Sequence, residues 1–377
     1  MEPSAHATIS RDTLPDNGAL PLTIHMMTAS LSPGDAICNY ILSLLSILRE
    51  SKHNVILYTD YPNAQFPAQH YHTSAYRSSG NDVLWFHYSI YSDNIRCLRE
   101  TNDYVVLDSH NVSPANLFHG YDAYLEYLCA EGERLLDEFP DKVQLAIAHS
   151  DYVREDLRRR GYRSVYKVPL VVDTKRFTGR ESDLWSPLLR HISYLLFIGR
   201  IVPQKDVAAM LHVFAALKQR RPNLKLFLLG SQPLRRYLSE MHALATELRV
   251  SDDVIFVGPV VDPEVLTSFY RHARFYLALS QWESFCVPII ESLYFGTPVA
   301  GRNVPPIPEI MNGGGFVVGD EPQDIAVQID EVWNDDATYQ RYAMIGRTHA
   351  EHFTDASLRS ALESVFQAIR LTPLRGQ

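Results

Sequence analysis

The sequence predicts an α/β protein made of two parallel sheets, each covered by helices. Three observations lead to this prediction. Short β-branched segments alternate with longer segments of helical period, which is the pattern of strands joined by crossover helices. The chain has 377 residues, enough for two domains at about 150 residues each. Its 46% hydrophobic and 21% charged residues are typical of a globular protein with a buried core.

The alternation is clear in the first half of the chain. Strands are predicted over Leu22 to Met27, Val55 to Tyr58, Val83 to His87, Tyr104 to Leu107 and Leu145 to His149. Helices are predicted from the turn after Gly34 through Glu50, and from Asp151 to Arg160, where Gly161 is a residue that typically follows a helix C-terminus.

The second half repeats the alternation after an irregular stretch. No period is recognisable between Pro169 and Ser193, so the domain linker is placed there. Strands are then predicted over Tyr194 to Ile198, Leu224 to Leu229, Val254 to Val257, Phe275 to Leu279 and Pro298 to Gly301. Helices are predicted over Asp206 to Arg220, Leu234 to Leu248, Pro263 to Ala273 and Pro288 to Phe295. A last segment, Leu358 to Leu371, has helical apolar spacing and is expected to pack back on the first domain.

These segments divide the chain into four predicted parts. They are a flexible leader (1–20), an N-terminal domain (21–175), a C-terminal domain (190–355) and a C-terminal helix (356–377). The leader lacks the apolar run of a signal peptide, and no apolar stretch reaches the length of roughly 18 to 20 residues that crosses a bilayer. The 4 cysteines include no C-x-x-C pair, which favours a reducing, cytoplasmic setting.

The formal net charge of -9 argues against a broad nucleic-acid-binding surface but leaves room for local basic sites. Because open α/β sheets bind ligands beyond the carboxyl ends of their strands, candidate residues are sought there. Gly34 and Asp35 form a turn after the first strand, which is either an anion seat or only a tight turn with a helix cap. Gly199 and Arg200, followed by Lys205, form a second turn. Both cations can point at one diphosphate, although an arginine and a lysine on a loop are usually solvated.

Two further places carry carboxylates and histidines. Glu283 lies on the loop after a strand, and Glu291 is predicted in the first turn of the helix that Pro288 opens. Ionised carboxylates only accept hydrogen bonds and therefore suit sugar hydroxyls, the alternative for Glu291 being a role at the helix terminus. His110 follows the Tyr104 to Leu107 strand and is favoured as functional, whereas a structural role is as plausible for His87.

Other chemistries lack their motifs. The sequence contains no G-x-x-x-x-G-K-[ST], G-x-S-x-G or H-E-x-x-H, no dinucleotide fingerprint after the first strand, and no D-x-D motif at a strand end. Cys286 has no histidine nearby in sequence that would activate it. His349 and His352 are more consistent with solvated side chains than with a metal site.

Taken together, these segments resemble glycosyltransferase family 4, whose members are retaining, nucleotide-sugar-dependent enzymes of the GT-B architecture. The motifs are the Gly199-Arg200…Lys205 turn, the segment from Glu283 to Glu291, Gly296-Thr-Pro-Val299, and Pro308-Glu309…Gly315. The resemblance covers most of residues 22–370. In the first half, His87 to Ile90, His110 to Pro114 and Gly34 to Ile37 resemble a bacterial branch that builds cell-surface polysaccharides.

The resemblance implies two Rossmann-like domains facing a central cleft, with the C-terminal helix crossing back to the first domain. It makes the N-terminal domain the acceptor domain and the C-terminal domain the nucleotide-sugar donor domain. It further implies a role for each matching residue. Arg200 and Lys205, at the turn that begins with Gly199, hold the diphosphate. Glu291 grips the ribose, and Glu283 and His110 face the donor sugar. The N–H groups of Phe285, Cys286 and Val287 contact sugar or phosphate, and Gly34 approaches the phosphates.

The activity implied is transfer of a hexose of mannose or glucose type from UDP or GDP to a saccharide or lipid-linked saccharide, with no metal or other cofactor. A catalytically silent GT-B partner subunit and a GT-B epimerase or phosphorylase are the alternatives. The commoner family pattern has glycine where Ser284, Cys286 and Asp206 stand, which predicts a narrower sugar pocket. Peripheral contact with the inner face of the plasma membrane is predicted through Arg154, Arg158, Arg159 and Arg160, the alternative being a solvated helix face.

Overall fold

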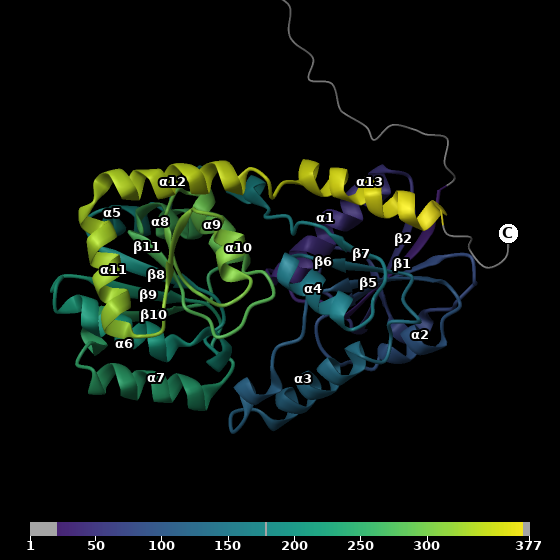
Figure 1. Ribbon diagram of the computed structural model, residues 1–377, viewed down its shortest axis with the longest axis horizontal. Helices are drawn as coiled ribbons and strands as arrows, with labels where there is room; N and C mark the ends of the chain where they lie inside the picture. The colour runs from purple at the N-terminus through teal and green to yellow at the C-terminus, as the bar shows by residue number, and fades with distance from the viewer. Residues whose placement is uncertain (1–20, 178, 372–377) are drawn as a thin grey trace, which may run out of the picture.

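The computed structural model describes residues 21–177 and 179–371. The predicted leader (1–20) and the end of the predicted C-terminal segment (372–377) lie outside these residues. The described strands form two sheets, in which every pair of neighbouring strands is parallel (Figure 1). The predicted fold class is therefore confirmed.

The first sheet has the strand order β3-β2-β1-β4-β5-β6-β7. Its strands are β1 (Thr23–Ser30), β2 (Asn54–Tyr61), β3 (His70–His72), β4 (Val83–Tyr88), β5 (Tyr104–Ser109), β6 (Leu145–Ala148) and β7 (Val165–Lys167). The helices of this half are α1 (Ala36–Glu50), α2 (Ile95–Glu100), α3 (Ala123–Leu136) and α4 (Asp151–Arg159). Every residue of β4 and β5 is buried, as expected for central strands covered on both faces.

The second sheet has the strand order β10-β9-β8-β11-β12-β13. Its strands are β8 (Tyr194–Ile198), β9 (Lys225–Leu229), β10 (Val254–Gly258), β11 (Phe275–Ala278), β12 (Val299–Arg302) and β13 (Gly315–Val318). The helices that follow the first sheet are α5 (Trp185–Leu189), α6 (Val207–Lys218), α7 (Arg235–Glu247), α8 (Pro263–His272), α9 (Val287–Tyr294), α10 (Ile307–Met311), α11 (Pro322–Asn334), α12 (Asp336–Ala350) and α13 (Asp355–Leu371). The two sheets lie on either side of the predicted linker, whereas the exact domain bounds stay a prediction.

Several elements were not predicted from the sequence. Strands β3 and β7 have three residues each, too few to show an alternating pattern. Helix α3 buries only Cys129, Gly132, Leu135 and Leu136, so its apolar period is weak. Helix α5 lies inside the stretch predicted to be irregular. Helices α10 to α12 and strand β13 were also not predicted.

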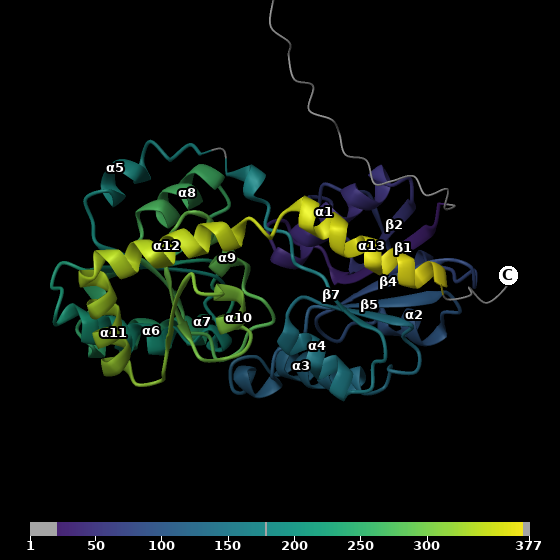
Figure 2. The same ribbon diagram turned by 45° about the horizontal axis from the view of Figure 1, so that its top comes forward.

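Helix α13 lies over the first sheet although it follows the second sheet in the chain (Figure 2). The ring of Phe366 stacks on that of His53 at a centroid distance of 4.8 Å, and Arg359 pairs with Glu50 of α1. The N–H of Val172 donates to the carbonyl of Phe353 over 3.0 Å just before this helix begins. The predicted return of the C-terminal helix to the first domain is therefore confirmed.

Residues that follow strands of the two sheets contact one another. Ser113, after β5, donates from its Oγ to Oε1 of Gln204, after β8, over 3.2 Å. Ser150, after β6, donates to the carbonyl oxygen of Ser284, after β11, over 3.3 Å. The carboxyl edges of the two sheets therefore meet, and we call this region the junction.

Candidate active site at the junction of the two sheets

The turn between β8 and α6 presents two cations, one paired and one unpaired. Position 199 favours glycine because a Cβ there would lie only 2.9 Å from the ring of Phe197, which is too close for a side chain. Nζ of Lys205 lies 2.6 Å from Oε1 of Glu283. Arg200 is exposed, and no described residue forms a hydrogen bond or an ion pair with its guanidinium. The turn therefore offers one cation that is free to bind an anion.

Glu283 is held at the junction by two donors. Its Oε1 accepts a hydrogen bond from Oγ of Ser280 over 2.7 Å as well as the contact from Lys205. Only 3% of the residue is exposed. The structure thus brings Glu283 and Lys205 together, as the sequence predicted, and orients the carboxylate before any ligand binds.

Glu291 does not lie in the first turn of its helix, as predicted, but in the second, because α9 begins at Val287 and not at Pro288. Its Oε2 accepts a hydrogen bond from the hydroxyl of Tyr270 over 2.7 Å, and its Oε1 pairs with Arg176. A capping role is therefore wrong. Arg176 belongs to the 3-10 helix Thr174–Arg176 of the linker and was missed by sequence reasoning, since no local pattern connects it with a carboxylate 115 residues away.

The loop that enters α9 has an unusual backbone. Cys286 precedes the first residue of the helix and has a left-handed φ of 77°. No described residue accepts a hydrogen bond from the N–H groups of Phe285 and Cys286, while the predicted contact of these groups and that of Val287 with sugar or phosphate stays a prediction. Burial, followed by the charge of Glu283, raises the pKa of the Cys286 thiol, so this thiol stays protonated and is a poor nucleophile.

The Gly34 turn is a tight turn that leads into a helix cap, which is one of the two alternatives that the sequence left open. Gly34 has a left-handed φ of 83°, and Oδ1 of Asp35 accepts from the N–H of Ile37 over 3.0 Å as the cap of α1. Val261 of the second half lies close, because a Cβ at Gly34 would come within 3.8 Å of its Cγ1. The turn thus reaches the second half of the molecule, while its predicted contact with phosphate stays a prediction.

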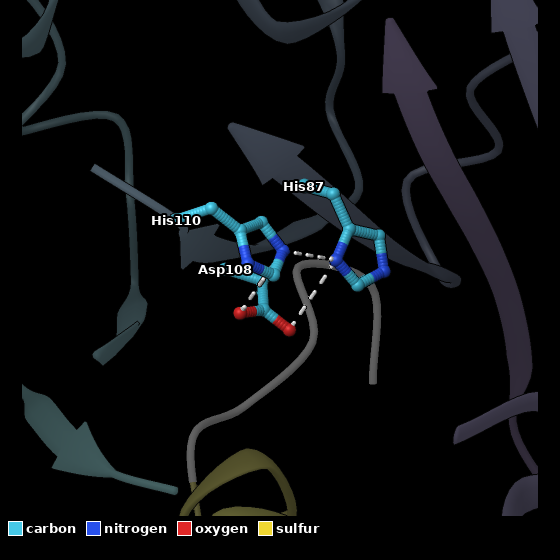
Figure 3. A group of neighbouring side chains, drawn as sticks. All are labelled: His87, Asp108 and His110. Atoms are coloured by element: carbon cyan, nitrogen blue, oxygen red, sulfur yellow. Dashed lines mark hydrogen bonds and ion pairs between the residues drawn. The ribbon is translucent and has the colours of Figure 1, made fainter. Parts of the chain in front are cut away.

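His110 belongs to a buried cluster built around Asp108 of β5 (Figure 3). Oδ2 of Asp108 accepts from Nε1 of Trp85 over 2.9 Å and from the hydroxyl of Tyr40 over 3.2 Å. Nδ1 of His87 lies 3.1 Å from Nε2 of His110 and 3.5 Å from Oδ2 of Asp108. Nε2 of His149 lies 2.9 Å from Oδ1 of Asp108. Burial disfavours the charged carboxylate, but the histidines, His149 foremost, outweigh this effect and lower the pKa of Asp108.

The hydrogen bonds of this cluster decide where its protons lie. Burial lowers the pKa of His87 to about 4 and that of His110 well below its usual value, so both rings are neutral near pH 7. Nε2 of His87 is buried, and no described residue contacts it. A proton there would be an unpaired buried donor, whereas a proton on Nδ1 serves both His110 and Asp108. His110 therefore accepts at Nε2 and carries its own proton on Nδ1.

His149 lies against the buried carboxylate of Asp108. Its Nδ1 lies 2.9 Å from the carbonyl oxygen of Val168, which can only accept, so Nδ1 carries a proton. Its Nε2 lies on the side of Oδ1 of Asp108. Asp108 and His149 were both missed by sequence reasoning. The available signals were a carboxylate inside an apolar strand and a second histidine at a strand end.

Two groups of side chains have the composition of metal ligands. Donor atoms of His87, Asp108 and His110 lie within 4.8 Å of one another. In this group Asp108 already accepts from Trp85 and Tyr40, and one proton is shared between the two rings. The expectation of a metal-free site stays a prediction.

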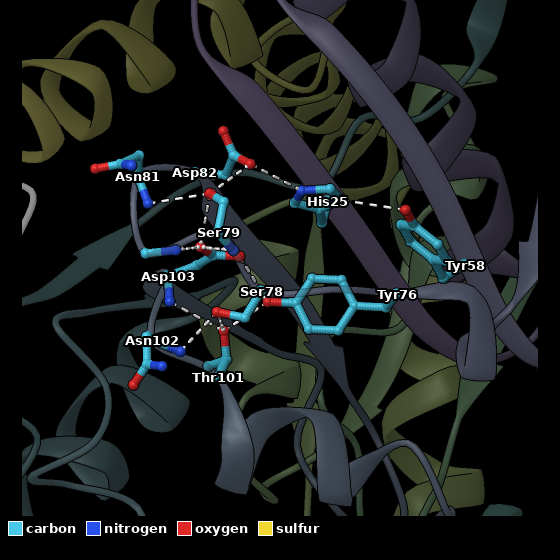
Figure 4. Close-up of polar contacts among 11 residues, drawn as sticks. His25, Tyr58, Tyr76, Ser78, Ser79, Asn81, Asp82, Thr101, Asn102 and Asp103 are labelled. Atoms are coloured by element: carbon cyan, nitrogen blue, oxygen red, sulfur yellow. Dashed lines mark hydrogen bonds and ion pairs between the residues drawn. The ribbon is translucent and has the colours of Figure 1, made fainter.

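The second group lies at the opposite, amino edge of the first sheet (Figure 4). It contains His25, Asp82 and Asp103. Oδ1 of Asp103 accepts from the N–H of Gly80 over 2.6 Å, and Oδ2 accepts from the hydroxyl of Tyr76 over 2.7 Å. These contacts hold the segment before β4 in place, which gives the group a structural role.

The basic residues of α4 and its C-terminal end are paired with carboxylates. Arg154 pairs with Asp151, Arg158 with Glu155, Arg159 with Asp156, and Arg160 with Asp137 and Asp156 as well as Glu133. This face is therefore close to neutral, which weakens its attraction for an anionic surface. Contact with a membrane stays a prediction. Within the described ranges, no helix combines the length and the apolarity needed to span a bilayer.

The decisive comparison concerns the half of the chain that contains Arg200, Lys205, Glu283 and Glu291. Residues 192–349 match the family described as Glycosyl transferases group 1. The family match and the junction geometry thus concern the same residues.

Curated relatives are similar to this chain over part of their length. A D-inositol 3-phosphate glycosyltransferase of Paenarthrobacter aurescens is 31% identical over 193 residues, which are 49% of this chain and 47% of the relative. An alpha-monoglucosyldiacylglycerol synthase of Streptococcus pneumoniae is 32% identical over 111 residues, 29% of this chain and 24% of the relative. The chain spans about half the length of the first curated relatives that it matches, at 47%, 44% and 50%.

Solved structures share the fold of both domains. Anabaena HepE in complex with UDP and glucose superposes with a TM-score of 0.71 at 17% identity, covering 92% of this chain and 100% of that one. Sucrose-phosphate synthase from Thermosynechococcus elongatus gives a TM-score of 0.71 at 17% identity, covering 93% and 99%. This likeness establishes the GT-B architecture of two Rossmann-like domains.

Proposed function

We propose that the protein is a retaining glycosyltransferase that moves a hexose of glucose or mannose type from a UDP- or GDP-activated donor. The acceptor is a saccharide or a lipid-linked saccharide, as in the synthesis of surface polysaccharides. The family match of residues 192–349 and the GT-B fold support the reaction type. The names of relatives that act on an inositol phosphate and a glucosyl lipid support a hydroxyl acceptor.

One observation carries this proposal. Arg200 is an exposed and unpaired guanidinium, and it shares its turn with Lys205, whose position is fixed by Glu283. An arginine without a carboxylate partner at the carboxyl edge of a parallel sheet is suited to binding phosphate oxygens with two parallel hydrogen bonds.

The reaction breaks the bond between the anomeric carbon and a phosphate oxygen, which leaves negative charge on the diphosphate. Arg200 and Lys205 stabilise this charge as it develops, and preorganised groups of this kind supply the largest share of such catalysis. The acceptor hydroxyl attacks from the face that the diphosphate leaves, and its proton passes to the departing phosphate oxygen. This route retains the anomeric configuration and uses cations of the chain itself in place of a metal ion.

Other junction residues orient the donor. Glu291 accepts hydrogen bonds from the ribose hydroxyls in the place of Arg176, whose guanidinium occupies this carboxylate in the free protein. His110, which carries a proton on Nδ1, donates a hydrogen bond to a sugar hydroxyl and does not act as a base. Free N–H groups at Phe285 and Cys286 provide further donors.

Thermal shifts with UDP, GDP and ADP test donor binding, because a ligand at 100 times its dissociation constant stabilises by about 2.7 kcal/mol. Transfer is then measured with the stabilising nucleotide's glucose and mannose donors. Arg200→Ala should lower turnover by about 10²- to 10³-fold, the range for loss of one preorganised charge-stabilising group. Lys205→Ala should act in the same direction. Arg163→Ala is the matched control, because this exposed arginine lies far from the β8–α6 turn in the chain and pairs with Asp141.

The alternatives have their own signatures. A silent partner subunit releases no nucleotide from a mixture of donor and acceptor. An epimerase converts the donor without an acceptor, and a phosphorylase requires inorganic phosphate. Undiminished transfer by both Arg200→Ala and Lys205→Ala would contradict the proposed roles.

A further inference from the structure

Four tyrosines form an exposed aromatic surface on the first domain, next to the junction. Tyr61, Tyr124 and Tyr127 are 62%, 65% and 54% exposed. The ring of Tyr91 packs edge-on against that of Tyr127 at a centroid distance of 6.1 Å. We call these four residues the tyrosine platform.

Three separate segments build the platform at the carboxyl edge of the first sheet. Tyr61 is the last residue of β2, Tyr91 follows β4, and Tyr124 and Tyr127 lie in the first two turns of α3. The N–H of Tyr91 donates to the carbonyl of Leu128 over 3.3 Å and ties the second segment to the third. The N–H of Asn94 donates to Oδ2 of Asp60, the neighbour of Tyr61, over 2.8 Å and ties the first segment to the second.

An exposed carboxylate accompanies these rings. Asp93 lies two residues after Tyr91, and its neighbour Asn94 is hydrogen-bonded to Asp60 beside Tyr61. The side chain of Asp93 is exposed, and it has no hydrogen-bond partner among the described residues. It is therefore available to accept hydrogen bonds from a ligand's hydroxyl groups.

The platform is continuous with the candidate active site through α3. Tyr121, just before this helix, donates from its hydroxyl to Glu240 of α7 in the second domain over 2.7 Å. Cys129, farther along α3, has its pKa raised by burial and partly lowered again by the charge of Arg200. Helix α3 thus extends from the tyrosine platform to the neighbourhood of the guanidinium proposed to hold the donor diphosphate.

Three properties favour a neutral saccharide as the occupant of this surface. The C–H faces of a sugar ring are apolar and pack on aromatic rings, whereas the hydroxyls at its rim require acceptors such as Asp93. Exposed aromatic patches on folded domains commonly mark binding sites. The exposed carboxylate of Asp93, which no described residue pairs with, makes the platform less favourable for an anionic lipid surface.

We propose that the tyrosine platform binds the saccharide acceptor, with Tyr61 and Tyr124 packing against sugar rings and Asp93 accepting from their hydroxyls. This inference rests on the proposed function, and it adds both a place for the acceptor and its chemical class. The acceptor then extends from Arg200 along the start of α3, so that more than one sugar unit contacts the protein.

A glycan array of neutral and acidic oligosaccharides tests the proposal on the full chain. The double variant Tyr61→Ala/Tyr124→Ala should bind neutral glycans about tenfold more weakly or less than the wild type. Tyr61→Phe/Tyr124→Phe keeps the rings and should retain most of the binding. Tyr71→Ala on the edge strand β3 is the control, because Tyr71 is 44% exposed but belongs to a different segment.

Thermal shifts with UDP and GDP are measured on the same proteins and should be equal in all of them. Nucleotide stabilisation without any binding of neutral glycans, or equal glycan binding by wild type and double variant, would overturn the platform and leave the proposed function intact. Absence of nucleotide stabilisation would count against the proposed function itself. Binding to phosphatidylglycerol vesicles that the double variant abolishes would identify the platform as a membrane contact and overturn the saccharide assignment.

Discussion

The two sides of the junction use charged residues in opposite ways. On the first domain, Asp108 is enclosed by Trp85, Tyr40 and three histidines, so its charge is stabilised by hydrogen bonds within the protein. On the second domain, Arg200 has no partner among the described residues, and Arg176 occupies Glu291. The first domain thus satisfies the charge of Asp108 with its own side chains, whereas the second domain leaves the guanidinium of Arg200 available to a ligand.

This difference gives the two domains different proposed roles, orientation of the sugars and stabilisation of the leaving diphosphate. The first domain presents neutral donors and aromatic rings, which orient uncharged sugars without strong electrostatic attraction. The second domain presents cations, which select a diphosphate and stabilise it as it leaves. Substitutions on the first side should therefore affect stability most, and substitutions on the second side should affect turnover most.

Asp108→Asn should have the largest effect on stability. The amide keeps the size of the side chain but removes the negative charge that accepts hydrogen bonds from Trp85 and Tyr40. Hydrogen bonds to a charged group contribute about 1.5 to 3 kcal/mol, and their weakening should appear in urea unfolding as a lower midpoint.

Asp183→Asn is the matched control for this variant. Asp183 is exposed in the linker, so its substitution should change the free energy of unfolding by about 0.5 kcal/mol or less. Equal stability of Asp108→Asn and the wild type would show that the carboxylate does not organise the cluster.

The pH dependence of stability should report the same cluster. His87 has a usual pKa of 6.5 and a folded pKa of about 4, so between these values the unfolded chain binds more protons than the folded one. Stability therefore rises with pH through this window and is lost as the pH falls from 6.5 towards 4. At 1.36 kcal/mol per pKa unit, the contribution of His87 is on the order of 3 kcal/mol.

Melting temperatures at several pH values check this window. His87→Gln should show a shallower loss of stability on acidification, whereas His191→Gln, a change at an exposed histidine, should parallel the wild type. Long-range ¹⁵N–¹H spectra of histidine-labelled protein provide an independent readout, with protonated Nδ1 expected at both His87 and His110. A proton on Nε2 of His110 would refute the proposed donor role.

The sequence predicted the parts of this site that depend on local pattern. Alternating apolar segments indicated both sheets, and Arg200, Lys205 and Glu283 follow strands whose carboxyl edges had to meet. It did not predict the pairing of Arg176 with Glu291, because those residues are 115 positions apart and meet only through the domain arrangement. The tyrosine platform could not be predicted for the same reason, because its members come from three separate segments of the chain.

A final comparison lies within the second domain, at two positions where the family commonly has glycine. Asp206 and Cys286 both have left-handed backbones, with φ of 50° and 77°. Such a conformation costs a non-glycine residue about 1 to 2 kcal/mol of stability. Glycine avoids this cost, but its greater conformational freedom in the unfolded chain offsets about 0.5 to 1 kcal/mol of the gain. On backbone grounds alone, Asp206→Gly and Cys286→Gly should each stabilise the protein by about 1 kcal/mol or less.

The side chains should separate the two variants. Oδ1 of Asp206 caps α6 by accepting from the N–H of Ala209 over 3.1 Å, and Oδ2 lies 2.7 Å from Nη1 of the buried Arg302. Losing the cap and this partner should destabilise Asp206→Gly by about 1 to 3 kcal/mol despite the relieved backbone. The Cys286 side chain makes no cap hydrogen bond, so Cys286→Gly should melt at or slightly above the wild-type temperature. Higher melting temperatures of both variants would show that the backbone alone governs both positions, whereas a lower melting temperature of Asp206→Gly alone would show that the cap and the ion pair of Asp206 outweigh its backbone strain.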